Sequence, residues 1–268
     1  MSKTSPSAIT TDEHWIDHSC GKLFARRWRA TPTGDAAPLV LFHDSLGCVA
    51  LWRDFPALLC AASGRDIIAY DRLGFGQSDA CTHPLSLTFV EDEAALFLPS
   101  LISHFGLERF VAVGHSVGGG MAVHAAARFP TRCVGLVTES AQAWVGPETV
   151  AGIRSAAQAF ADPGQFSRLQ KYHGRRARWV LDAWIETWLD PLFTGWSLDA
   201  ALPSVQCPLL AIHGQLDEYG SPEHPAHLAD SSGGPAQVHI LPANGHVPHR
   251  ERAGEVTRLV AQFLATLA

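Results

Sequence analysis

Short apolar runs alternate with helical patterns along most of this chain. The runs are almost continuously hydrophobic, which is typical of strands buried on both faces of a parallel sheet. Strands are predicted at residues 22–30, 38–42, 66–70, 110–113, 133–138, 208–212 and 238–241. Helices are predicted at about 51–62, 88–105, 117–129 and 252–267. This alternation predicts an α/β fold with a mainly parallel sheet flanked by helices.

The alternation stops between residues 144 and 196, where helical patterns continue without a convincing strand. This segment is rich in tryptophan and holds Trp144, Trp179, Trp184, Trp188 and Trp196 out of eight in the chain. The strand pattern then resumes. We therefore predict one core domain formed by residues 1–143 and 201–268, interrupted by a helical cap at 144–200.

Composition and charge narrow the class of protein. Of the 268 residues 47% are hydrophobic and 17% charged, which supports a buried core and argues against disorder. The net charge is −6 without a basic run, so we expect neither nucleic acid nor an anionic membrane as a partner. The polar N-terminus resembles no signal peptide and no apolar run could span a bilayer, which predicts a cytoplasmic protein. The six scattered cysteines are expected to be buried free thiols.

The sequence Gly114-His115-Ser116-Val117-Gly118 stands between a predicted strand and a predicted helix. A serine on such a tight turn is held in a strained conformation at the start of the helix, and the flanking glycines remove side-chain clashes. The helix N-terminus also favours negative charge there. Ser116 is therefore the candidate nucleophile. The alternative is a glycine-rich turn whose serine only caps the helix.

A nucleophilic serine needs donors for the negative oxygen that develops during acyl transfer. One candidate is the backbone N–H of Val117. The second is the backbone N–H of Ser45, in the loop after the strand that ends at Phe42. The alternative is that this loop is only a glycine-containing turn.

The candidate base is His246, in the loop between the last predicted strand and the final helix. Histidine suits this role because its unperturbed pKa is about 6.5. His249 is the nearest rival, whereas His43 and His115 are expected to pack or form hydrogen bonds. His246 and His249 lack a third ligand cluster, so we expect no metal site.

The acid that orients the base should also follow a core strand. Asp217 comes shortly after the strand at 208–212 and precedes His246 in the chain. Glu139, at the end of the preceding strand, is the rival. Glu218 should point away if Asp217 points inward.

Five motifs in the same order resemble the α/β-hydrolase superfamily across nearly the whole chain. They are LVLFHDSLG near residue 43, AYDRLGFGQSD at 69–79, VGHSVGGG around Ser116, HGQLDEYG around Asp217 and ANGHVPH around His246. The resemblance implies an eight-stranded, mostly parallel sheet with a helical cap after the sixth strand. It also implies that Asp71, Arg72, Gly74 and Gly76 form a structural loop.

Asp44 and Ser116 help to decide to which branch of this superfamily the chain is similar. The family usually has His-Gly where this chain has His43-Asp44, and a carboxylate there would oppose the oxyanion unless it is paired or points away. Arg53 and Arg72 are the candidates to pair with it. A serine at 116 argues against the dehalogenase and epoxide-hydrolase branches, which use an aspartate there.

These features together predict a serine hydrolase acting on a small to medium, apolar carboxylic ester through an acyl-enzyme, without metal or organic cofactor. The same triad would also serve a C–C bond, a thioester or perhydrolysis, and a non-catalytic ligand receptor or a structural partner protein is a less favoured alternative. The expected partner is a small-molecule ester, and a homodimer is left open.

Four aromatic side chains are candidates to line the substrate pocket: His43, Trp144, Trp184 and Trp188. Trp184 and Trp188 recur at helical spacing with Val180, which is also the pattern of simple packing between cap and core. If they line a pocket, it should be modest in size and apolar.

Overall fold

A single twisted sheet forms the centre of the computed structural model, which describes residues 9–30 and 35–267. Its strand order is β1-β2-β4-β3-β5-β6-β7-β8. The strands are β1 (Thr10–Ile16), β2 (Leu23–Arg29), β3 (Leu39–Phe42), β4 (Ile67–Tyr70), β5 (Phe110–His115), β6 (Cys133–Glu139), β7 (Leu209–Gly214) and β8 (Ala236–Leu241). β2 runs antiparallel to both β1 and β4, and every other neighbouring pair is parallel. The predicted eight-stranded, mostly parallel α/β sheet is confirmed.

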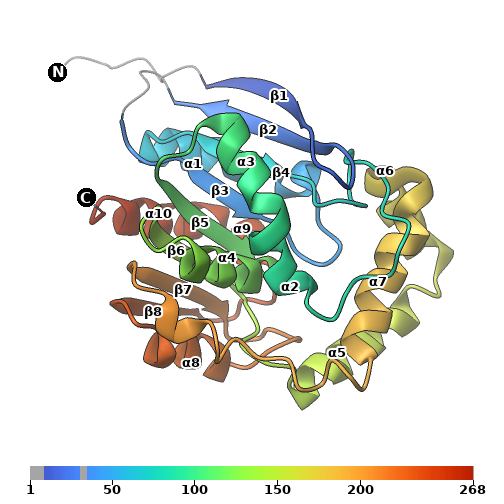
Figure 1. Cartoon of the computed structure of the whole chain (residues 1–268). Helices are drawn as coiled ribbons and strands as arrows, with labels where there is room; N and C mark the ends of the chain where they lie inside the picture. The colour runs from blue at the N-terminus through green and yellow to red at the C-terminus, as the bar shows by residue number, and fades with distance from the viewer. Residues whose placement is uncertain (1–8, 31–34, 268) are drawn as a thin grey trace.

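Helices cover both faces of the sheet (Figure 1). Helices α1 (Phe55–Ser63) and α10 (Ala253–Leu264) pack on one face, and α3 (Leu98–Phe105), α4 (Val117–Arg128) and α8 (Glu223–Ser231) on the other. Successive side chains of a strand point to opposite faces. Val40 and Leu41 of β3 accordingly belong to the two different apolar cores. Burial on both faces explains why the central strands are continuous apolar runs.

The helix predicted at 88–105 is interrupted in the structure. It consists of α2 (Phe89–Asp92), a π-helical turn (Glu93–Phe97) and α3. Pro99 explains the break, because proline supplies no N–H for the regular hydrogen bond and its ring crowds the preceding turn. The buried Glu93 in this turn accepts a hydrogen bond from Tyr70 Oη at 2.7 Å, and burial raises the pKa of Glu93 to about 7.

Three helices are inserted between β6 and β7 and lie together at one side of the sheet (Figure 1). They are α5 (Pro147–Ala159), α6 (Pro163–His173) and, after a short 3₁₀ turn (Gly174–Arg176), α7 (Ala177–Leu189). We call them the helical insertion. Side chains from all three share a cavity with Ser45, Ser116 and His246, so the insertion lies over the loops that follow β3, β5 and β8.

Two observations complete the fold. Within residues 9–30 and 35–267, no helix combines the length and the apolar character that crossing a bilayer requires. Cys48, Cys60, Cys133 and Cys207 are buried free thiols, whereas Cys20 is exposed and Cys81 half-buried, contrary to the expectation that all six are buried.

Candidate active site

Ser116 occupies a strained turn between β5 and α4. Its backbone has φ 56° and ψ −128°, a combination that L-residues rarely adopt. The Ser116 N–H donates to Glu139 O at 2.8 Å, which ties the turn to the neighbouring strand β6. A Cβ on Gly114 would lie 2.0 Å from Gly118 O, so the crossing of the two chain segments requires glycine. The turn thus holds the serine at the carboxyl end of the sheet.

His246 and Asp217 meet in the structure although each belongs to a different loop. His246 Nδ1 lies 2.8 Å from each carboxylate oxygen of Asp217. The Asp217 side chain is fully buried, and that of His246 is 11% exposed. Burial alone would raise the pKa of Asp217, but the hydrogen bond and charge of His246 hold it below its usual range. An ionised Asp217 therefore orients the imidazole and leaves Nε2 for proton transfer.

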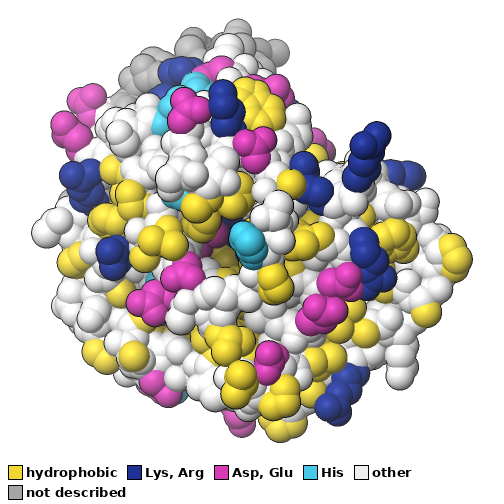
Figure 2. All heavy atoms as spheres, turned by 45° about the vertical axis from the view of Figure 1, so that its right-hand side comes forward, with side chains coloured by type: hydrophobic (Ala, Val, Ile, Leu, Met, Phe, Trp, Pro, Cys, Tyr) yellow, Lys and Arg dark blue, Asp and Glu magenta, His cyan; other side chains and the backbone are white. Residues whose placement is uncertain are grey.

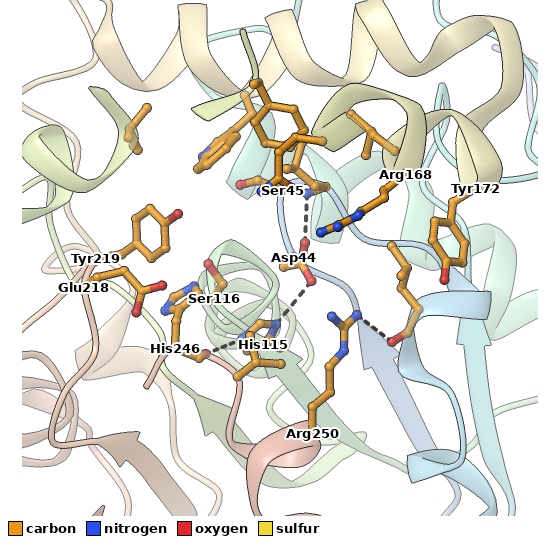
Figure 3. Close-up of a pocket in the computed structure, with 18 of the residues that line it drawn as sticks. Asp44, Ser45, His115, Ser116, Arg168, Tyr172, Glu218, Tyr219, His246 and Arg250 are labelled. Carbon is orange, nitrogen blue, oxygen red and sulfur yellow. Dashed lines mark hydrogen bonds and ion pairs between the residues drawn. The ribbon is translucent and has the colours of Figure 1, made fainter. Parts of the chain in front are cut away.

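Ser116 and His246 appear next to each other in the view of Figure 3. Both side chains line the same cavity. Within the described residues, no hydrogen bond joins the Ser116 hydroxyl to His246. Such contacts are often long in unliganded enzymes and tighten when substrate binds. The structure thus brings the three candidate residues together. Of their two expected hydrogen bonds, the one between His246 and Asp217 is formed.

Two backbone N–H groups are available beside Ser116. Val117 is the first residue of α4, where N–H groups have no partner within the helix. Ser45 lies in a turn that Asp44 closes, because Asp44 Oδ1 accepts from Leu46 N at 2.8 Å and Asp44 O from Gly47 N at 3.1 Å. Neither bond uses the N–H of Ser45. Among the described residues neither of these N–H groups donates to a loop or side-chain acceptor, and Ser45 and Ser116 line the same cavity, so both remain candidate oxyanion donors.

The partner of the Asp44 carboxylate is His115, which corrects the expectation that Arg53 or Arg72 pairs with it. His115 Nδ1 lies 3.3 Å from Asp44 Oδ2, and His115 Nε2 donates to the backbone O of His246 at 2.7 Å (Figure 3). Arg72 donates instead to the backbone O of Asp44 at 3.0 Å.

The contacts of His115 determine its charge. Two ring nitrogens that both face acceptors require an imidazolium. Burial by itself would lower the pKa of His115, but the hydrogen bond and charge of Asp44, the charge of Glu139 and the hydrogen bond to His246 O together outweigh burial, and the pKa is raised. Burial likewise opposes ionisation of Asp44, yet His115 holds its pKa well below the usual range. The pair neutralises the carboxylate beside the nucleophile and joins the Ser45 loop to the His246 loop.

The rival acid and the rival base pair with each other. Glu139 Oε2 accepts from His249 Nδ1 at 3.0 Å and from His249 N at 3.2 Å. The Glu139 side chain is fully buried, and the His249 ring packs against Trp52 and Phe55 with ring centroids 4.8 and 5.2 Å apart. Neither Glu139 nor His249 lines the cavity that holds Ser116. In the described part of the chain, no group of three or more His, Cys, Asp or Glu side chains is arranged to hold a metal ion.

The cavity in front of Ser116 has a volume of about 560 Å³ and is covered by the helical insertion. Trp184 and Trp188 line it, as predicted. His43 and Trp144 do not, which corrects two of the predicted pocket residues. His43 is buried, donates from Nδ1 to Asp44 O at 2.8 Å and accepts from Arg72 N at 3.1 Å, so it is committed to holding the loop. Trp144 stacks on His224 instead, with ring centroids 4.1 Å apart.

Sequence reasoning missed several residues around the site. Glu251 accepts from Gly245 N at 2.7 Å and from Val247 N at 3.1 Å, and so fixes the backbone on both sides of His246. The Tyr219 ring packs against His246 with centroids 4.7 Å apart. The spacing of Glu251, five residues after His246 in a predicted helix start, was a usable signal; the contact of Tyr219 was not. Glu218 is exposed at the rim of the cavity, next to the buried Asp217.

Comparisons with known proteins identify the family of this chain. Residues 37–175, just over half of the chain, match the family model described as alpha/beta hydrolase fold. The chain is 28% identical over 258 residues to a 2-hydroxymuconate semialdehyde hydrolase from Pseudomonas sp. (strain CF600), covering 87% of this chain and 88% of that protein. It is 28% identical over 209 residues to a serine hydrolase of Mus musculus, covering 74% of this chain and 69% of that protein.

Among solved structures, the fold is similar to an enol-lactonase from Burkholderia xenovorans LB400, with a TM-score of 0.73 and 20% identity over 94% of this chain and 100% of that one. It is also similar to a thermophilic esterase from Thermogutta terrifontis, with a TM-score of 0.71 and 22% identity over 95% of this chain and 98% of that one. These two likenesses concern the fold alone. Together with the family match and the sheet topology, they lead to one conclusion: the chain belongs to the α/β-hydrolase fold family, a family of hydrolases.

Proposed function

We propose that this protein is a serine hydrolase that cleaves a small to medium carboxylic ester through an acyl-enzyme intermediate. The observation that carries the proposal is the convergence of Ser116, His246 and Asp217 at one cavity. The Ser116 turn is strained, and His246 Nδ1 lies 2.8 Å from both oxygens of a buried Asp217 carboxylate. Because Nδ1 is held by Asp217, His246 Nε2 remains available for the serine hydroxyl in the shared cavity.

The first half of the reaction forms the acyl-enzyme. His246 Nε2 takes the hydroxyl proton while Ser116 Oγ attacks the ester carbonyl carbon. The carbonyl oxygen becomes an oxyanion and accepts hydrogen bonds from the N–H groups of Val117 and Ser45. Asp217 stabilises the imidazolium. When the tetrahedral intermediate collapses, the C–O bond to the alcohol breaks and His246 returns the proton to the leaving oxygen.

The second half of the reaction releases the acid. His246 removes a proton from a water molecule, whose oxygen attacks the acyl carbon and again forms an oxyanion at the same two N–H groups. Collapse then breaks the bond to Ser116 Oγ, and His246 gives the serine its proton back. The chain's own residues therefore account for every proton that moves.

The cavity supports a substrate of limited length. A volume of about 560 Å³ lies within the range typical of small-molecule sites. Trp184 and Trp188 of α7 line it and are themselves almost fully buried, so they cannot swing away without disturbing the packing of the insertion. We expect p-nitrophenyl acetate or butyrate to be cleaved faster than the palmitate, and faster turnover of the long chain would contradict the size estimate.

A fluorophosphonate probe followed by mass spectrometry tests the nucleophile. Folded wild-type protein should carry the label on Ser116, and Ser116→Ala should neither be labelled nor cleave p-nitrophenyl butyrate. Ser45→Ala is the matched control, because it removes a hydroxyl in the same cavity and keeps the backbone N–H. A wild-type protein that stays unlabelled at Ser116 while its thermal unfolding remains cooperative would refute the proposal.

A second candidate function keeps the triad and changes the bond. The relative from Pseudomonas sp. (strain CF600), which the chain matches over most of its length, is named for a semialdehyde rather than an ester. C–C bond hydrolysis is therefore the alternative that a specific observation favours, ahead of thioesters and perhydrolysis. Product analysis with esters, vinylogous diketones and acyl thioesters decides among them. The preferred class is the one with the highest kcat/KM.

A further inference from the structure

The cavity in front of Ser116 reverses the charge balance of the chain. Overall the chain has 20 Lys and Arg residues against 26 Asp and Glu. The cavity is lined by the cations Arg53, Arg168, Lys171 and Arg250, and by only two acids. One of these acids, Asp44, is already neutralised by His115. The lining therefore has an excess of positive charge within an acidic protein.

These four cations lack carboxylate partners, unlike many cations elsewhere. Within the described residues, no ion pair joins any of the four to an acid. Several arginines outside the site are paired with carboxylates, namely Arg26, Arg27, Arg29, Arg178 and Arg252. Among the described residues, the Arg250 guanidinium donates to Leu51 O at 2.8 Å, which fixes its position without compensating its charge. Unpaired guanidinium groups that converge on one cavity are suited to bind an anion.

The arrangement of these cations is one-sided. Arg168 comes from α6 and Arg250 from α9 (Pro248–Glu251), and Figure 3 shows both side chains on the side of Ser116 opposite Tyr219 and Glu218. Figure 2, which turns the right-hand side of Figure 1 forward, shows Lys and Arg side chains on the right part of the face with some acidic side chains among them. Glu218 disfavours an anion on the other side. An anionic group would therefore lie toward Arg168 and Arg250.

Much of the remaining lining is apolar, and most of that apolar part comes from outside α6 and α9. Ile153 belongs to α5, and Trp184 and Trp188 belong to α7. The reacting group, Ser116, lies at the same cavity. One cavity thus offers an apolar surface and a basic surface to different parts of one small molecule. An ester without a charge would use only the first of these surfaces.

Building on the proposed esterase function, we infer that the preferred substrate carries an anionic group, a carboxylate or a phosphate, a few bonds from the scissile carbonyl. The anion binds between Arg168 of α6 and Arg250 of α9, and the apolar part packs against α5 and α7. Lys171 and Arg53, which are exposed like Arg168 and Arg250, add to the field that attracts the anion. The two arginines determine specificity by holding the substrate across Ser116 and leave the chemistry to the triad.

A matched pair of substrates tests this inference. Mono-p-nitrophenyl glutarate carries a free carboxylate, and its methyl ester has nearly the same shape without the charge. Wild-type enzyme should prefer the free acid by about 10-fold or more in kcat/KM at low salt, mainly through KM. The preference should shrink as sodium chloride rises from about 0.02 to about 0.5 M, because salt screens exposed charges. The p-nitrophenyl ester of 4-phosphonobutyrate shows whether carboxylate or phosphate is favoured.

Variants locate the effect. The double variant Arg168→Gln/Arg250→Gln should reduce the ratio of the two kcat/KM values by about 10-fold. Arg175→Gln is the control, because Arg175 is exposed next to α6 but does not line the cavity, and it should leave the ratio unchanged. The wild-type comparison stands by itself if the double variant fails to fold.

The outcomes separate this inference from the proposed function. If both esters are cleaved at Ser116 with equal kcat/KM, or the neutral one is preferred, the anion inference is wrong and the esterase function stands. A control variant that changes the ratio as much as the double variant would also overturn the assignment to Arg168 and Arg250. If neither ester is cleaved and Ser116 stays unlabelled, the proposed function itself fails.

Discussion

Two carboxylate–histidine pairs lie close together at the carboxyl end of the sheet, and only one of them faces the cavity. Asp217 and His246 are 2.8 Å apart, and Glu139 and His249 are 3.0 Å apart. Both carboxylates are fully buried. The His246 side chain retains 11% exposure and lines the cavity, whereas the His249 side chain is 2% exposed.

The two pairs differ in whether a substrate can reach the histidine, and not in how the acid and the histidine are hydrogen-bonded. His249 is enclosed by Trp52 and Phe55, so no substrate reaches its ring, and burial lowers its pKa. A neutral His249 can donate its Nδ1 proton to Glu139 and support the turn that holds Ser116. A hydrogen-bonded acid and histidine are thus not sufficient evidence of a catalytic pair; the histidine must also reach the reacting atoms.

The sharpest way to break this comparison is to remove each histidine in turn. His246→Gln should lower kcat/KM for p-nitrophenyl butyrate by about 10⁴-fold or more, because the serine loses its base. His249→Gln should lower it by less than about 10-fold. Initial rates measured on both purified proteins, with circular dichroism as the check on folding, decide the matter. Equal losses would remove the distinction between the pairs.

Changing the two carboxylates should give the next largest effect. Asp217→Asn should reduce kcat by about 10³- to 10⁴-fold, since an amide can no longer stabilise the imidazolium. Glu139→Gln should keep kcat within about 10-fold but lower the free energy of unfolding by about 1 to 3 kcal/mol, because one buried acceptor of His249 is weakened. Initial-rate assays measure kcat, and urea unfolding measures the free energy of unfolding. A large kcat loss in Glu139→Gln with full stability would reassign the acid.

The contribution of the Asp44–His115 pair to the stability of the fold should depend on pH. The pKa of His115 is raised above 6.5 on folding, so its contribution to stability is present below pH 6.5 and is lost as the pH rises through the raised value. The pKa of Asp44 is lowered below 3.8, so its contribution is present above pH 3.8 and is lost as the pH falls through the lowered value.

The pair should therefore stabilise the fold most between these two limits. Asp44→Asn should cost about 1 kcal/mol of unfolding free energy at about pH 5.5 and much less at about pH 9. Urea unfolding of wild type and variant at the two pH values provides the measurement. A cost that is the same at both, or greater at the higher pH, would show that the two side chains are not an ion pair.

The smallest effect is expected at Glu251, whose carboxylate holds the loop of His246. Glu251→Gln keeps the size of the side chain and weakens its two hydrogen bonds to Gly245 N and Val247 N. We expect kcat to fall by about 3-fold with KM nearly constant, because the base is positioned less well. Glu255→Gln on α10 is the matched surface control. A change in KM alone would point to the cavity instead of the loop.

Much of the sheet was predictable because its central strands are buried on both faces. The apolar runs at 38–42 and 66–70 became β3 and β4, displaced by only one residue at their starts. β1 was missed because it is an edge strand whose exposed, polar residues give a weak signal. α8 was missed too, and it contains Pro225 near its start, which obscures a helical pattern.

The candidate triad could be located from the chain because each member follows a strand, and parallel strands end at the same edge of a sheet. The partner of Asp44 could not, since His115 lies 71 positions away, at the end of β5. The failures at His43 and Trp144 have the same origin: which side of a loop faces a cavity depends on how the insertion packs, and local sequence does not determine that. The basic lining from α6 also depends on that packing.

The order of the three loops along the chain has a consequence for how activity appears during folding. Ser116 follows the fifth strand, but Asp217 and His246 follow β7 and β8, which pair at the far edge of the sheet. A chain that has assembled only its first six strands therefore holds a serine with no base to activate it. During refolding or synthesis, the onset of ester cleavage should mark the arrival of the last strand pair rather than the collapse of the core. A chain that lacks β7 and β8 in its sheet should therefore not cleave esters.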